Sequence, residues 1–165
     1  LRWPEGLGGA RGQHLPQPVE IRDVLPTFLD AAGAAVPEAV EGSSMLNLVR
    51  GNTDGWREYI DLEHDVCYDV KNHWTALTDG KQKYIFHAFD GEEQFFDLES
   101  DPGEEKDLAG DPAHTQTLQL WRSRMIAHLE PRGEEWVKNG NLVLHKNRIL
   151  HSPNYPVIAE DKKKT

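Results

Sequence analysis

The run from Trp56 to Leu108 constrains this chain more than any other segment, because it holds both the strands and the turns of an antiparallel sheet. Two Asp-Gly pairs, at 79–80 and 90–91, each stand between short runs rich in aromatic and β-branched residues. Such pairs favour hairpins with type I′ turns, in which both central residues need positive φ. The run therefore predicts a meander of strands near 57–63, 74–78, 82–88 and 93–98.

A first helix is predicted over 24–32, with Asp23 as its N-cap. Pro26 falls in its first turn and Gly33 follows its end, as the preferences of helix termini require. Its apolar residues fall on one face, so we expect this helix to pack against something larger than itself. A second, short helix is predicted at 45–50.

A long helix is predicted over 112–129, starting at Pro112 and ending before Pro131. Apolar residues recur along it at three- and four-residue steps, which is typical of a helix that lies across a sheet. In the tail, Asn-Gly at 139–140 favours one further short hairpin. The sequence thus predicts an α+β fold, with a four-stranded antiparallel sheet and one long packed helix.

Composition limits the partners of the chain. Its 165 residues suffice for one domain with a core, and 18 basic against 28 acidic residues give a net charge of −10. Such a surface repels nucleic acid and anionic membranes, and no apolar run approaches the ~20 residues that cross a bilayer. Cys67 is the single cysteine and forms no intramolecular disulfide. Because the chain starts at Leu1 rather than Met, we expect a processed or truncated product.

The densest polar cluster lies at the end of the first strand and contains Asp61, Glu63, His64 and Asp65. Alternation along a strand puts Glu63 and His64 on opposite faces, so the acids do not converge with the histidine and a metal site has little support. Two interpretations stay open. The cluster is either a solvated strand end or the place where His64 faces a ligand.

A second candidate group opens the next strand. Trp74, with the imidazole of His73 and the ammonium of Lys71, could stack on a sugar ring and hold an anionic group. The alternative is plain packing, because the aromatic residues of the meander recur at the spacing of core and cross-strand pairs. His114 and His128 are interpreted as residues on a helix surface.

Four short segments follow one another along the chain: PVEIRDVLPTFLDAAG, GSSML at 42–46, TDGKQKYIFH and EEQFFDLESDPGEEKDLA. In this order they resemble the C-terminal portion of the sulfatase family, of the arylsulfatase-like kind. The resemblance implies that the chain is the C-terminal subdomain of an alkaline-phosphatase-like α/β fold. It also implies three regions, namely 1–55 as the end of the large domain, 56–130 as the sheet-and-helix subdomain and 131–165 as a C-terminal extension.

The resemblance further implies sulfuric ester hydrolysis by a formylglycine, made from Cys or Ser in a C/S-x-P-x-R motif, with a calcium ion that clamps the sulfate oxygens. No Cys or Ser of this chain has both the Pro and the Arg of that motif. We therefore expect formylglycine and calcium in an N-terminal catalytic portion, which acts as the partner of this chain. The chain alone is expected to be inactive and to hold neither catalytic residues nor metal ligands.

Substrate recognition is the role that the resemblance leaves to this chain. His64 with Glu63 is the first choice, at a strand end expected to point toward the large domain, and Asn72, His73 and Trp74 come second. The substrate of the whole enzyme would be a sulfated carbohydrate or an aryl sulfate.

Two other hypotheses stay open. The chain could be a free-standing, non-catalytic binding module for sulfated glycans or other anions. It could also be a misassigned reading frame that folds poorly, because the apolar face of helix 24–32 would lie uncovered.

Overall fold

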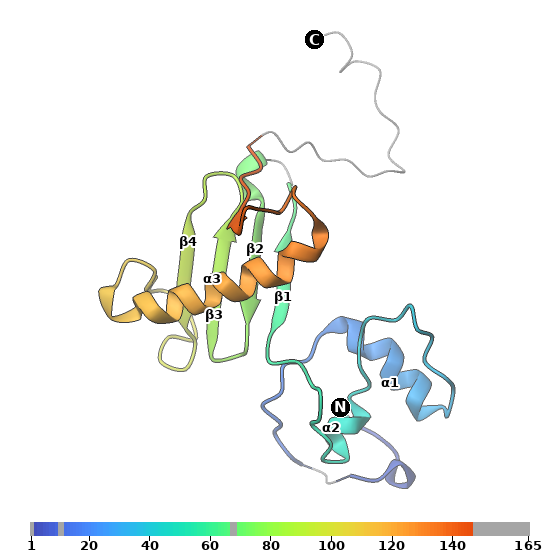
Figure 1. Cartoon of the computed structure of the whole chain (residues 1–165). Coiled ribbons are helices and arrows are strands. Elements are labelled where there is room, and N and C mark those ends of the chain that lie inside the picture. The colour runs from blue at the N-terminus through green and yellow to red at the C-terminus, as the bar shows by residue number, and fades with distance from the viewer. Residues whose placement is uncertain (1, 10–11, 67–68, 147–165) are drawn as a thin grey trace.

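The computed structural model describes residues 2–9, 12–66 and 69–146 (Figure 1). Cys67 and the tail beyond residue 146, with most of the predicted extension, lie outside these ranges. Two parts of the chain are distinguished below. The N-terminal unit, up to residue 55, carries two short helices, and the sheet unit, from residue 56 onward, carries a four-stranded sheet with a helix across it.

One antiparallel sheet forms the centre of the sheet unit. Its strands lie in chain order, which confirms the predicted meander: β1 (Ile60–His64), β2 (Trp74–Thr78), β3 (Gln82–His87) and β4 (Glu93–Asp97). The prediction for β1 was wrong at its start, which is Ile60 instead of residue 57. Ile60 pairs with Thr78, the last residue of β2, so the residues before Ile60 precede the ladder.

The turns correct one prediction and confirm another. In the two Asp-Gly pairs only Gly80 (φ 86°) and Gly91 (φ 85°) have positive φ, so these turns are not of type I′. The Asp79 carboxylate instead accepts the N–H groups of Lys81 and Gln82, which closes a longer loop. The tail hairpin does use Asn139 (φ 52°) and Gly140 (φ 72°), both positive as type I′ requires. This turn joins β5 (Val137–Lys138) to β6 (Asn141–Leu142).

Helix α3 (Thr115–Leu129) crosses one face of the sheet (Figure 1). A 3₁₀ turn at Pro112–His114 precedes it, so the predicted helix is confirmed with a tighter first turn. The core between helix and sheet contains Leu118, Trp121, Met125 and Leu129 together with Leu77, Tyr84, Phe86 and Phe95. Burial of each large apolar side chain contributes about 1.5–3 kcal/mol to stability.

In the described part of the chain, no helix is both long and apolar enough to cross a membrane.

A polar triad ties this helix to the sheet. The Arg122 guanidinium binds the Glu93 carboxylate through two hydrogen bonds of 2.6 and 2.5 Å, and the buried Tyr84 hydroxyl donates to the same carboxylate. Burial and the adjacent carboxylate raise the pKa of Tyr84. Burial alone would raise the pKa of Glu93, but Arg122 and Tyr84 outweigh it and hold that pKa below its usual value. The triad therefore holds a charged carboxylate between β4 and α3.

The acidic segment after β4 is a structural loop. Asp107 accepts the backbone N–H of Phe95 at 3.0 Å, and the N–H of Leu108 donates to the Phe95 carbonyl at 2.8 Å. Lys83 on β3 binds the Glu104 carboxylate, with Nζ 2.7 Å from Oε2. The two hydrogen bonds to Phe95 satisfy backbone groups of β4 at the outer edge of the sheet, where an unpaired strand would otherwise face solvent.

The N-terminal unit is built around α1 (Val24–Ala31), against which α2 (Leu46–Val49) and the loop 42–46 pack. Gly42 touches the backbone of the turn before α1. A Cβ atom on Gly42 would stand 2.0 Å from the carbonyl oxygen of Arg22. The loop therefore requires glycine at this position.

Asp23 joins the two units. It was predicted as a helix N-cap, and its side chain makes no capping hydrogen bond to α1. Its fully buried carboxylate instead accepts two hydrogen bonds of 2.6 Å from the Arg57 guanidinium and one of 2.9 Å from the Ser43 N–H. Trp56 adds a hydrogen bond from its indole N–H to the Pro18 carbonyl at 2.9 Å. The segment before β1 is thus held to the N-terminal unit.

Replacing Asp23 by Asn should lower the free energy of unfolding by about 3 kcal/mol, because it removes the buried carboxylate that accepts two hydrogen bonds from the Arg57 guanidinium. Burial raises the pKa of Asp23, but Arg57 and two backbone N–H groups outweigh it, so the pKa lies below its usual value. The stabilisation is present above about pH 4 and is lost as the pH falls below it. Urea unfolding between pH 3 and 7 measures the free energy of unfolding of both proteins. The difference in this free energy between wild type and variant should become smaller toward pH 3. Exposed Asp54→Asn is the matched control, and an equal loss there would contradict the assignment.

Substitution of Gly42 by Ala should cost about 1–3 kcal/mol, because the new methyl group meets the backbone of Arg22. Gly110→Ala is the control, since a Cβ atom at Gly110 meets no atom within 4 Å. That change should stay within about 0.5 kcal/mol of wild type. Chemical denaturation of both variants distinguishes the two effects, and similar midpoints would show that the close approach at Gly42 is unimportant.

Candidate functional site

Three of the predicted site residues come together where β1 ends and β2 begins. His64 pairs with Trp74 across the strands, and their rings stack with centroids 5.7 Å apart at 17°. A 3₁₀ turn at Val70–Asn72 places the Asn72 carbonyl 2.7 Å from Nδ1 of His64. A carbonyl only accepts hydrogen bonds, so Nδ1 carries the proton and Nε2 is the acceptor of the neutral ring. We call His64, Trp74 and Asn72 the aromatic corner.

Glu63 lies on the opposite face of the sheet from the aromatic corner. Its carboxylate binds the Arg132 guanidinium with Nη1 2.8 Å from Oε2, below the end of α3. Tyr59, two strand periods earlier, packs on Trp121 of the same helix. The alternation read from the sequence is therefore confirmed, and Glu63 and His64 do not converge on one ligand.

His73 is fully buried, although it was grouped with Trp74 as a candidate binding residue. Its ring lies against Trp136, with centroids 5.7 Å apart at 81°, and against His145, with centroids 5.0 Å apart at 29°. Both neighbours come from the segment after α3. Their distance along the sequence left no local signal from which this cluster could be predicted.

A second charged group lies on the helix side of β1. The Asp61 carboxylate binds Arg22 of the N-terminal unit and stands 3.9 Å from Nε2 of His128. Desolvation lowers the pKa of His128, and Asp61 offsets this only in part. The interpretation of His128 as a surface residue was therefore wrong, because the helix turns this side chain toward the sheet. Asp61 thus joins the two units through Arg22, whereas its contact with His128 lies within the sheet unit.

The N-terminal unit contacts the start of β1, whereas the aromatic corner lies at its end (Figure 1). Because β1 has five residues, its first and last Cα atoms lie roughly 13 Å apart at about 3.3 Å per residue. The expectation that this strand end points toward the large domain remains a prediction.

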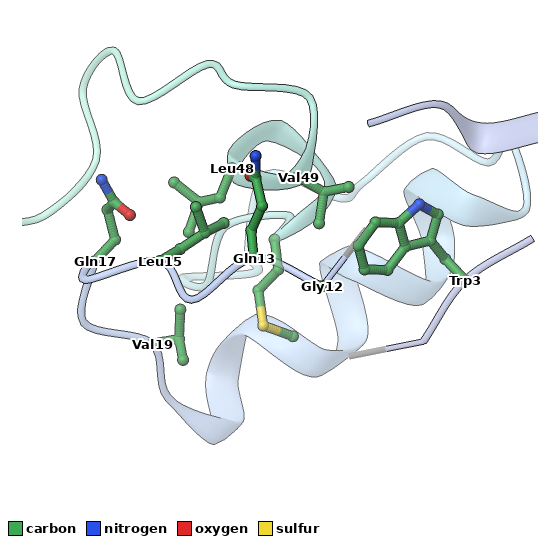
Figure 2. A pocket seen from close by; sticks show the side chains of 9 residues that line it. Trp3, Gly12, Gln13, Leu15, Gln17, Val19, Leu48 and Val49 are labelled. Atoms are coloured by element: carbon green, nitrogen blue, oxygen red, sulfur yellow. The ribbon is translucent and has the colours of Figure 1, made fainter. Parts of the chain in front are cut away.

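A cavity of about 300 Å³ lies in the N-terminal unit between residues 12–19 and helix α2. Figure 2 shows Leu15, Val19 and Val49 among the side chains that surround it, with Trp3 at one end. The lining side chains are apolar or carry an amide, so the cavity suits an apolar group and supplies no acid, base or nucleophile.

Across residues 2–9, 12–66 and 69–146, no group of three or more His, Cys, Asp or Glu side chains is placed to hold an ion. The described residues therefore supply no ligand set for the calcium ion that the resemblance implies.

Comparison with known proteins matches residues 1–130 to the family model described as N-sulphoglucosamine sulphohydrolase, C-terminal. An arylsulfatase from Clostridium perfringens is 36% identical over 138 residues, which cover 84% of this chain and 28% of that enzyme. A choline-sulfatase from Rhizobium meliloti is 34% identical over 74% of this chain and 24% of its own length. The chain thus spans well under half the length of these relatives.

Solved structures agree with this match. A 2-O GAG sulfatase superposes with a TM-score of 0.62 at 25% identity, covering 77% of this chain and 28% of that enzyme. A phosphonate monoester hydrolase from Silicibacter pomeroyi has a TM-score of 0.57 at 22% identity, over 81% of this chain and 30% of its own, and supports the fold alone. The chain belongs to the N-sulphoglucosamine sulphohydrolase C-terminal family, which is the C-terminal region of sulfatases.

Proposed function

We propose that this chain is the C-terminal part of a sulfatase, which completes the fold of the enzyme and contributes to substrate recognition. The match of residues 1–130 to a sulfatase C-terminal family carries the proposal. The aligned segment is 28% of the related arylsulfatase, and no C/S-x-P-x-R motif occurs in this chain. Formylglycine, calcium and the hydrolytic step then belong to an N-terminal catalytic portion that acts together with this chain.

The contacts between the two units support a division of the chain into three regions. Residues 1–55 would complete the large domain, residues 56–130 would form the C-terminal subdomain, and residues 131–165 would extend it. The Asp23–Arg57 pair and the Arg22–Asp61 pair support this division, because they are ionic contacts between two separately packed units. Within the proposed enzyme, these contacts would fix the sheet unit relative to the large domain.

Recognition is assigned to the aromatic corner. Trp74 and His64 are both half-buried and present one stacked aromatic surface, which suits the C–H face of a sugar or an aryl ring. When protonated, Nε2 of His64 can donate to a hydroxyl or sulfate oxygen. A delta 4,5-hexuronate-2-O-sulfatase from Bacteroides thetaiotaomicron is also among the relatives, 28% identical over 81% of this chain. We accordingly propose a sulfated carbohydrate or an aryl sulfate as the substrate of the whole enzyme.

Glu63 and His73 have a smaller place in this proposal than the sequence suggested. The carboxylate of Glu63 is engaged by Arg132 on the other face, and the His73 ring is enclosed by Trp136 and His145. We assign both to holding the strand end in place. Asn72 contributes through its backbone carbonyl, which orients the His64 ring.

A fusion enzyme tests the recognition role. This chain would replace the matched C-terminal segment of the Clostridium perfringens arylsulfatase, and hydrolysis of a chromogenic aryl sulfate would be measured. His64→Ala should lower kcat/KM about tenfold, mainly through KM, because it removes one ligand-facing ring and its hydrogen bond. His14→Ala, at an exposed position of the N-terminal unit, is the matched control. Equal kcat/KM values for the two variants would refute the role of His64.

The chain by itself should not hydrolyse the same aryl sulfate in the presence of calcium, because it lacks the nucleophile motif. Turnover by the purified chain would refute the proposal that hydrolysis belongs to an N-terminal catalytic portion.

The alternative of a free-standing binding module is favoured only by the aromatic corner being formed within this chain. Calorimetry with a sulfated oligosaccharide tests that alternative, and heat that disappears in His64→Ala would support it.

A further inference from the structure

The aromatic corner continues across the sheet onto β3. Trp74 pairs with His64 of β1 on one side and with His87 of β3 on the other. Residues directly opposite each other in antiparallel strands point to the same face of a sheet. This face lies away from α3, because Trp74 packs against the Ile85 cluster, which is separate from the core under the helix. We call His64, Trp74 and His87 the three-ring row.

The imidazole of His87 is oriented in the same way as that of His64. Its Nε2 lies 2.9 Å from Oε1 of Gln94 on β4, just as Nδ1 of His64 lies 2.7 Å from the Asn72 carbonyl oxygen. A carbonyl oxygen only accepts, so the nitrogen that faces it carries the proton and the other nitrogen of the neutral ring is an acceptor. Gln94 is therefore a positioning residue, which presents Nδ1 of His87 as an acceptor.

Trp74 adds a donor between these two acceptors. Its side chain is half-buried, and within the described part of the chain its indole N–H has no hydrogen-bond partner. Adjacent strands lie about 4.7–4.9 Å apart, so the row extends roughly 9–10 Å from His64 to His87. An aryl sulfate offers only acceptor oxygens and cannot donate to two imidazoles. The hydroxyls of a saccharide donate and accept, so they suit both imidazoles and the indole.

A cation lies beside the row. The Lys71 ammonium stands 5.9 Å from the centre of the Phe89 ring, and Phe89 follows His87 by two residues. Lys71 belongs to the same 3₁₀ turn whose Asn72 carbonyl orients His64. Its side chain is exposed, and no carboxylate of the described residues forms an ion pair with it. An ammonium in this position can bind a sulfate group of the same ligand.

We propose that His87, oriented by Gln94, is a specificity-determining residue of the sulfatase, an inference that rests on the function proposed above. The three-ring row then binds a sulfated saccharide of two or more rings, whereas the aromatic corner alone would accept a single aryl ring. The stacked pair of His64 and Trp74 carries one sugar, and His87 accepts a hydroxyl of the next. Lys71 binds a sulfate of the saccharide.

Competition in the fusion enzyme described above measures the role of His87. A mixed pool of sulfated disaccharides from heparin and chondroitin sulfate would inhibit hydrolysis of the chromogenic aryl sulfate. His87→Ala should raise the inhibition constant of the pool about tenfold and leave KM for the aryl sulfate within about twofold, because it removes a hydrogen bond to the second ring only. His87→Gln, which keeps an acceptor, should recover part of this loss.

His114→Ala is the matched control. It removes another half-buried histidine, whose ring lies near Phe95 on the helix side of the sheet, and should leave both constants unchanged. No inhibition of the wild-type fusion by the pool would overturn the proposal. An unchanged inhibition constant in His87→Ala, or an equal rise in that constant and in KM, would also overturn it. Equal inhibition by the pool after desulfation would overturn the sulfate contact of Lys71.

The isolated chain separates this inference from the proposed function. In NMR spectra, the sulfated pool should shift the imidazole signals of His87 and the indole N–H signal of Trp74, assigned with His87→Ala and Trp74→Phe. The signals of His114 should stay unchanged. Absence of these shifts would overturn the proposal. A fusion that hydrolyses no aryl sulfate would count against the proposed function, and the NMR shifts alone would then support or overturn saccharide binding by the row.

Discussion

A buried ion pair between Asp23 and Arg57 connects the two halves of this chain, and the arrangement of its neighbours depends on it. A carboxylate with no solvent exposure is tolerated because the guanidinium and the N–H groups of Glu20 and Ser43 replace its water. The same carboxylate anchors the loop 42–46 to the start of α1. One side chain thus orders the N-terminal unit internally and fixes the direction in which β1 leaves it.

The segments that carry the family resemblance mostly serve architecture. Gly42 permits a close backbone contact, and the following loop binds the polar side of α1 through Thr27. Asp107 in the acidic segment ties a loop to β4 through the N–H of Phe95. Such residues tolerate few substitutes, because a side chain at Gly42 would meet backbone atoms and the loss of Thr27 or Asp107 would leave a partly buried N–H group without its acceptor. The resemblance consequently identifies the scaffold.

Much of the fold could be predicted because its signals are local. Alternating strand residues, the apolar stripe of α3 and the Asn139-Gly140 turn depend on residues a few positions apart. The start of β1 could not be predicted, since it depends on where Thr78 ends the partner strand. The Asp-Gly pairs predicted the positions of the turns correctly. They predicted the turn type wrongly, because the Asp79 side chain closes a longer loop.

For the candidate site, the sequence by itself determined that Glu63 and His64 face opposite ways, because a strand alternates its side chains. Only the tertiary structure decided that His73 is enclosed by Trp136 and His145, more than sixty positions away along the chain. The same holds for α1. Its sequence shows an apolar stripe, whereas the inward direction of its polar side follows from hydrogen bonds to a loop that the helix meets only after folding.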